Sequence, residues 1–148
     1  MKALSLFLVL FSLIFFTACE GPGLGGKVEK TYFTGGKVKS EFIMTDSTGR
    51  NGQLKKYGYE GHLTSVVNIQ NSVKNGMEVM YDSRGRVISK TPYVNGRKHG
   101  TKKDFYPNGD VLGTIPYQYG MKEGTAFSYN KDGTVHKKVI FQKDRLIN

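Results

Sequence analysis

The sequence predicts an all-β protein, an elongated array of antiparallel β-hairpin repeats in a single twisted sheet. Glycines recur every 24 residues, aromatic and aliphatic positions keep the same spacing, and apolar residues alternate with polar ones inside each copy. A fixed period of this kind is the signature of a repeat protein, and alternation with period two indicates strands. The glycines form two columns, both interpreted as turn residues: Gly52, Gly76, Gly100 and Gly124, then Gly61, Gly85, Gly109 and Gly133.

Further columns show how many copies the chain holds. The aromatic and aliphatic columns are Tyr57, Tyr81, Phe105 and Tyr129; Leu63, Val87, Val111 and Val135; and Ile69, Tyr93, Tyr117 and Phe141. An earlier copy fits at an offset of 25, where Tyr32 matches Tyr57 and Gly36 matches Gly61. We therefore expect five copies over residues 27–147.

Each copy is expected to form one hairpin. β-Branched and aromatic residues alternate with polar ones, and turn residues such as Asn108-Gly109 and Asn95-Gly96 separate the strands. Asn-Gly pairs favour type I′ turns, because both central residues need positive φ. Five hairpins would form a meander of about ten strands and about 45–50 Å.

Two prolines fall at the same position of neighbouring copies, Pro92 and Pro116. Proline has no N–H to donate to a strand ladder. We expect each of these strands to bulge at the proline or to point it away from the pairing edge.

The turn and strand motifs resemble a known repeat. Asn-Gly-Arg-Lys-His-Gly at residues 95–100, followed by Phe105-Tyr106 and Asn108-Gly109, resembles the MORN repeat in its bacterial variant. The resemblance covers residues 71–142 and is looser over 27–70, where Ser72 replaces a turn glycine. It implies a hairpin array that binds or scaffolds rather than catalyses. MORN proteins have been linked to membrane phospholipids and to protein partners, and some bacterial relatives are labelled antitoxin-like.

Residues 1–18 are predicted to be a lipoprotein signal peptide. Lys2 is followed by an apolar run over residues 3–16, too short for a comfortable membrane span, and then by small residues before Cys19. This end resembles a bacterial lipobox, with Phe16 where leucine is usual, and it implies lipidation of Cys19. Cys19 is the only cysteine, so it makes no internal disulfide. A signal peptide cleaved elsewhere and an uncleaved anchor are the alternatives.

The predicted order is therefore anchor, tether and repeat domain. Residues 19–26 hold the cysteine and a glycine-rich segment expected to act as a flexible tether, and residues 27–148 hold the repeats. The expected location is the bacterial cell envelope, on a membrane. Glu20, rather than aspartate, follows the cysteine, which by analogy with enteric sorting favours the outer membrane over the inner one.

The chain is basic. It has 22 Lys and Arg against 12 Asp and Glu, and removing Lys2 leaves 21 against 12, a net charge of +9. Such an excess favours anionic partners, although the export signal argues against nucleic acid. One basic column is in phase with the repeat: Arg50, Lys74, Lys98 and Lys122. One interpretation is a basic edge, with charges about 9–10 Å apart, that binds a surface of regularly spaced negative charge. The other is a solvated edge, in which lysine recurs only because the repeat itself recurs.

The aromatic residues also have two interpretations. The candidate aromatic face is Tyr57, Tyr81, Phe105 and Tyr129. Together with the column of Tyr93, Tyr117 and Phe141, it either lines an exposed groove that stacks on sugars or peptides, or forms cross-strand ladders in a thin core.

No catalytic or metal site is predicted. His62, His99 and His136 are 37 residues apart, which is not the repeat period, and no zinc-site spacing occurs. The aspartates in turns lack the clustering of a calcium loop, and no nucleophile elbow or phosphate-binding loop is present. We therefore expect no enzyme activity, metal or cofactor. The expected function is protein interaction or scaffolding; the alternatives are binding of an anionic lipid or glycan surface and an immunity protein.

Overall fold

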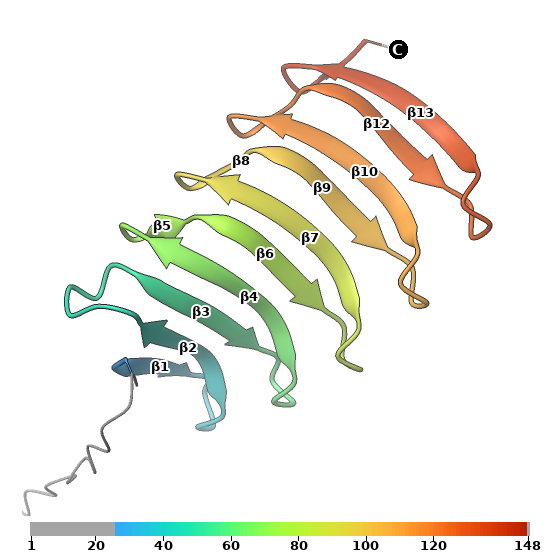
Figure 1. Cartoon of the computed structure of the whole chain (residues 1–148). Helices are drawn as coiled ribbons and strands as arrows, with labels where there is room; N and C mark the ends of the chain where they lie inside the picture. The colour runs from blue at the N-terminus through green and yellow to red at the C-terminus, as the bar shows by residue number, and fades with distance from the viewer. Residues whose placement is uncertain (1–25, 148) are drawn as a thin grey trace, which may run out of the picture.

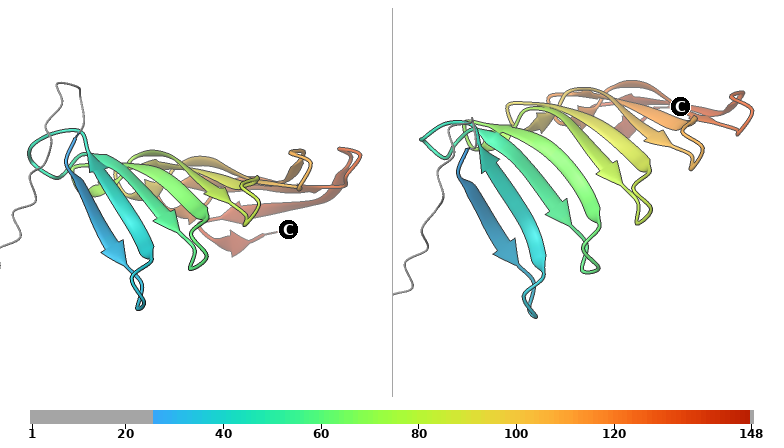
Figure 2. Two further views of the ribbon diagram at one scale, coloured as in Figure 1. Left: turned by 90° about the horizontal axis from the view of Figure 1, so that it is seen from below. Right: turned by 60° about the horizontal axis from the view of Figure 1, so that its bottom comes forward.

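The computed structural model describes residues 26–147. The predicted signal peptide, Cys19 and most of the tether lie outside these residues. All strands of the described part belong to one antiparallel sheet, and strands that follow one another along the chain are neighbours in space (Figure 1). Figure 2 shows this sheet as a single curved layer. The described residues contain no helix that could cross a membrane.

The predicted meander of ten strands is confirmed. Ten strands of five to eight residues form the sheet: β1 (Val28–Tyr32), β2 (Val38–Met44), β3 (Gly52–Tyr57), β4 (Leu63–Gln70), β6 (Gly76–Tyr81), β7 (Val87–Val94), β9 (Gly100–Phe105), β10 (Val111–Gln118), β12 (Gly124–Tyr129) and β13 (Val135–Gln142). Four strands of two residues follow β4, β7, β10 and β13: β5 (Val73–Lys74), β8 (Arg97–Lys98), β11 (Met121–Lys122) and β14 (Arg145–Leu146). Each short strand pairs with the end of the long strand before it.

The expected irregularity at the prolines is a break in the pairing. The N–H of His99 donates to the carbonyl oxygen of Pro92 at 3.0 Å, between β8 and β9. Gly100 then opens β9 with a φ of 101°. Pro116 and Gly124 repeat the arrangement one copy later, with a φ of 102° at the glycine. The proline position and the glycine position are therefore two sides of one bulge.

This geometry corrects the role of the first glycine column. Its members begin β3, β6, β9 and β12 rather than occupying turns. A Cβ atom on Gly100 would lie 3.2 Å from Cγ of Pro92, and one on Gly52 would clash with the carbonyl oxygen of Ile43. The second column does occupy turns, and a Cβ atom on Gly85 or Gly109 would meet nothing within 4 Å.

The turns within the hairpins were expected to be type I′, and this prediction is wrong. Between β6 and β7, the N–H of Asp82 donates to the carbonyl of Arg86 at 2.9 Å, which leaves three residues in the loop, of which only Gly85 has positive φ. A three-residue loop that ends in a left-handed glycine is the next most common hairpin connection. Type I′ turns join the copies instead, as at Asn95 and Gly96, with φ values of 49° and 79°.

The core is thin and lies on one side of the sheet. Because directly paired residues of neighbouring strands share a face, the register defines face A, which carries Val67 and Thr91, and face B, which carries Val66 and Lys90. In the described part, the buried side chains all belong to face A: Met44, Ser65, Val67, Ser89, Thr91 and Ala126. Face B has only half-buried and exposed side chains.

Replacing Gly100 by alanine is expected to destabilise the sheet. The new Cβ atom would meet Pro92 on a backbone with a φ of 101°, and a left-handed backbone costs a residue other than glycine roughly 1–2 kcal/mol. Thermal unfolding of the variant should show a lower Tm, whereas Thr101→Ala at the exposed neighbouring position should change it little. An unchanged Tm for Gly100→Ala would show that the bulge does not need glycine.

Candidate functional site

The predicted basic column does not form a solvated edge. Lys74, Lys98 and Lys122 lie in β5, β8 and β11, and each is half-buried on face A. Their ammonium nitrogens lie over aromatic rings of the next copy: Lys74 over Tyr93 at 4.7 Å, Lys98 over Tyr117 at 4.9 Å, and Lys122 over Phe141 at 4.9 Å from the ring centroids. A cation over a ring face is stabilised by the ring quadrupole. These three lysines therefore contribute to the packing between copies.

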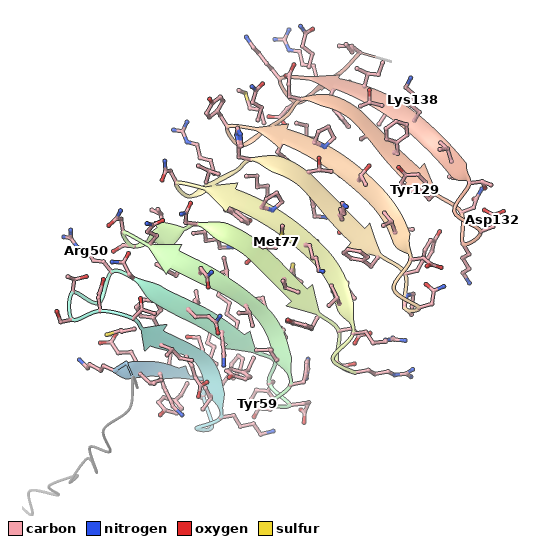
Figure 3. The ribbon with its side chains drawn as sticks, viewed as in Figure 1. Arg50, Tyr59, Met77, Tyr129, Asp132 and Lys138 are labelled. Carbon is pink, nitrogen blue, oxygen red and sulfur yellow. The ribbon has the colours of Figure 1, made fainter. Side chains whose placement is uncertain are left out.

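Arg50, the fourth member of the column, lies before β3 and near the turns at one margin of the sheet (Figure 3). Its carbonyl accepts the N–H of Ser72 at 2.8 Å. The same bond recurs from copy to copy: Lys74 accepts from Gly96 at 2.8 Å, Lys98 from Gly120 at 2.8 Å, and Lys122 from Asp144 at 3.0 Å. The column is thus joined to the following turn through its backbone.

A neighbouring column of side chains supports the same turns. Each member accepts a backbone N–H from the next turn: Asn51 from Asn71 at 2.8 Å, Asn75 from Asn95 at 3.3 Å, His99 from Tyr119 at 3.5 Å, and Glu123 from Lys143 at 2.8 Å. This column is hard to recognise in the sequence, because Asn, His and Glu side chains have in common only that each carries a hydrogen-bond acceptor. It also gives His99 a structural place in the repeat.

The two aromatic columns lie on opposite faces, so they do not line one groove. Tyr93 pairs with Gly76 on face A, and Tyr81 lies an odd number of residues from Gly76 in the same strand. Because successive strand residues alternate between faces, Tyr81 belongs to face B. Within the described residues, no ring contact joins members of the column of Tyr57, Tyr81, Phe105 and Tyr129 to one another.

The rings of this column interact with other side chains of face B. The hydroxyl of Tyr57 donates to Oε2 of Glu41 at 2.6 Å. This bond raises the pKa of Tyr57 to about 12, and it lowers the pKa of Glu41. Tyr129 stacks on Phe127 with 6.1 Å between ring centroids. The rings are half-buried, which leaves part of each available to a ligand.

Face B carries a row of lysines that the sequence analysis did not identify. Directly paired residues form this row across the sheet: Lys30, Glu41, Lys55, Val66, Val79, Lys90, Lys103, Thr114, Phe127 and Lys138. We call Lys55, Lys90, Lys103 and Lys138 the lysine row. Lys30 is excluded because it forms an ion pair with Glu41 at 2.9 Å.

A sequence signal for the lysine row does exist. Lys55 and Lys103 are 48 residues apart, and so are Lys90 and Lys138. Each pair therefore repeats in every second copy, at positions where the intervening copy has valine or threonine. A search at the period of one copy does not find it, and only the strand register places both pairs in one line.

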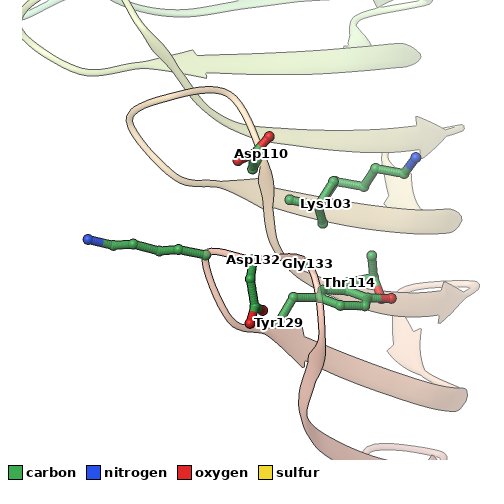
Figure 4. Close-up of a pocket in the computed structure, with 8 residues that line it drawn as sticks. Lys103, Asp110, Thr114, Tyr129, Asp132 and Gly133 are labelled. Carbon is green, nitrogen blue, oxygen red and sulfur yellow. The ribbon is translucent and has the colours of Figure 1, made fainter.

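A hollow adjoins the C-terminal half of the lysine row. It measures 480 Å³ and lies between two successive hairpin turns, lined by residues that include Lys103, Thr114, Tyr129 and Asp132 (Figure 4). The carboxylate of Asp132 accepts bonds from the N–H and the hydroxyl of Thr134, which lower its pKa. Within residues 26–147, no group of His, Cys, Asp or Glu side chains could hold a metal ion.

The pairing of Lys98 with the ring of Tyr117 can be measured by a double-mutant cycle. We expect Lys98→Gln and Tyr117→Leu each to destabilise the sheet, with a coupling of roughly 0.5–2 kcal/mol, the range between exposed and desolvated cations over a ring. Denaturant unfolding of the four proteins gives the coupling. Lys103→Gln with Tyr117→Leu is the matched control and should show no coupling, because these side chains lie on opposite faces. Zero coupling for the first pair would contradict the packing role.

Comparison with known proteins supports the repeat. Residues 98–119, which run from the end of β8 through β10 and the first residue after it, match the family model of the MORN repeat variant. No curated protein matches the sequence. A crystal structure of a mutant of S. aureus TarM in complex with Fondaparinux, alpha-GlcNAc-glycerol and UDP is similar at 13% identity and a TM-score of 0.46, over 71% of this chain and 20% of that one. The chain thus spans about a fifth of that protein, and nothing about function follows from the likeness. The family match covers one of the recurring hairpins, and it supports MORN-type repeats as the architecture of the array.

Proposed function

We propose that the chain is a non-enzymatic interaction module, anchored in the bacterial cell envelope through a lipidated Cys19, that holds a protein partner. MORN repeats are commonly modules for interaction with proteins or membranes. The observation that carries the proposal is the open sheet, which has no second layer in the described part (Figure 2). A sheet normally buries one face against another element, so an uncovered sheet this long favours a surface for binding.

Exposed apolar side chains support a protein partner. Met77, Ile88, Val94 and Leu112 lie in β6, β7 and β10 and are 38–47% exposed. Met77 lies near the middle of the sheet (Figure 3). Apolar side chains gathered on one surface are typical of interaction sites.

The last strand offers a second mode of binding. β14 pairs only with the final two residues of β13, which leaves the rest of the outer edge of β13 without a partner within the described residues. Val135 on this edge is 56% exposed. An edge of this kind can accept an added strand from a partner.

The anchor is proposed from the sequence. The apolar run, the small residues before Cys19 and the absence of a second cysteine support it. β1 begins at Val28, nine residues after Cys19, so the intervening segment can span at most about 30 Å. The sheet would therefore be held close to the membrane, and Glu20 favours the outer membrane.

Replacing Cys19 by alanine tests the anchor. We expect the variant to lose metabolic labelling with palmitate and to move from the membrane fraction to the soluble fraction, because the thiol is the only site for the lipid. Ser12→Ala, inside the predicted signal peptide, is the control and should remain labelled. Membrane association of Cys19→Ala at the level of the unchanged chain would exclude the lipid anchor.

Crosslinking of the unchanged chain in the envelope tests the protein partner. It should capture one protein in stoichiometric amount, and the absence of such a protein would contradict scaffolding.

A further inference from the structure

We propose that face B binds a linear acidic polysaccharide that lies across the strands, along the lysine row. This inference goes beyond the proposed function, because it concerns a second class of ligand and does not depend on the anchor or on the protein partner. Four observations carry it: unpaired charge, like charges directly opposite each other on neighbouring strands, the length of the row, and the side chains on its two flanks.

The charge of the lysine row is balanced only at its N-terminal end, where Glu41 of β2 lies opposite Lys55. From β3 to β13, no aspartate or glutamate belongs to face B, as the strand register shows. Within residues 26–147, no ion pair or side-chain hydrogen bond involves any of the four lysines of the row. Face A differs, because Glu78 is paired with Lys74 at 2.6 Å and Asp104 with Lys102 at 2.5 Å. The four lysines of the row are therefore free to bind an outside anion.

Two of these lysines oppose each other. Lys90 of β7 and Lys103 of β9 are direct cross-strand partners, and both are exposed. Like charges directly opposite one another destabilise a sheet. A bound anion between them would remove this repulsion, so the pair indicates where an anionic group would sit. The ammonium of Lys90 lies 5.7 Å from the ring centroid of Phe105, which places an aromatic surface next to the same point.

The row is long and narrow. Lys55 and Lys138 are separated by seven strand-to-strand steps, or about 34 Å at the usual spacing of strands. The row is one residue wide along the strand direction. This shape fits a single extended chain with repeated negative charge better than a broad planar surface.

The flanks of the row supply the other groups that a sugar needs. On one side, two residues along the strand, lie half-buried rings: Tyr57, Tyr81, Phe105 and Tyr129. On the other side lie carboxamides and hydroxyls: Gln53, Asn68, Thr101 and Thr125. Ring faces can pack on the C–H faces of sugars, ammonium groups can bind carboxylates, and amides and hydroxyls can bond sugar hydroxyls. An anionic membrane would use only the charge.

The test uses polygalacturonate and its methyl ester, which has the same sugar without the charge. The full chain, in neutral detergent micelles, should bind fluorescent polygalacturonate, bind it less as salt increases, and bind the methyl ester far more weakly. The row variant changes all four lysines to glutamine: Lys55→Gln, Lys90→Gln, Lys103→Gln and Lys138→Gln. It should bind about tenfold or more weakly, because four ionic contacts are lost.

The matched control removes the same charge elsewhere. Its exposed cations lie on face A or in turns and have no ion pair in the described part: Lys56→Gln, Arg84→Gln, Lys137→Gln and Lys143→Gln. This variant should keep most of the affinity, and circular dichroism should show both variants folded. Tyr81→Ala, on the flank of the row, should also weaken binding.

Three results would overturn the proposal. The first is equal affinity of the row variant and the control, which would reduce the effect to net charge. The second is equal binding of polygalacturonate and its methyl ester. The third is binding of phosphatidylserine-containing micelles, but not of polygalacturonate, through the lysine row, which would favour a membrane as the ligand. None of these results would affect the lipidation of Cys19 or the capture of a protein partner, so the two proposals fail independently.

Discussion

The structure depends on the backbone hydrogen bonds that join each copy to the next turn. Within residues 26–147 the sheet has no second layer, and only six side chains other than glycine are buried, so burial alone holds little of it together. The recurring bond from a turn N–H to a carbonyl of the preceding copy, such as Gly96 to Lys74 at 2.8 Å, compensates for the missing layer. It needs the type I′ turn on one side and the bulge at Gly100 on the other. Pro92 fits this arrangement because its carbonyl is used while its nitrogen needs no partner.

The two faces of the sheet differ in the side chains that they carry. Face A holds the buried side chains, the ion pairs of Glu78 and Asp104 with lysines, and the cations that lie over Tyr93, Tyr117 and Phe141. Face B keeps half-buried rings, exposed apolar side chains and unpaired lysines. The stability of the array therefore depends mainly on one face, which leaves the other face free to vary with a ligand.

Much of the fold could be predicted from the sequence, because the hairpin, its strands and the irregularity at Pro92 all follow from spacing and alternation. The function of individual columns could not. Gly76 and Gly85 look alike in a sequence, yet one opens a strand and the other closes a loop. In the sequence, Lys98 has the spacing expected of an exposed edge. The strand register instead places it on face A, where its ammonium group lies over the ring of Tyr117. The lysine row escaped detection because its period is two copies and its members come from both strands of the hairpin.

Amide hydrogen exchange at the turns tests the central claim most directly. The N–H groups of Ser72, Gly96, Gly120 and Asp144 lie in short exposed turns, where exchange is normally fast, yet each donates to the preceding copy at 2.8–3.0 Å. The account predicts that these four amides are protected to nearly the same degree as the strand amides beside them, because they open only when neighbouring copies separate. Exchange of these amides as fast as that of the loop residue Ser83 would contradict it, since the copies would then be held together by strand pairing alone.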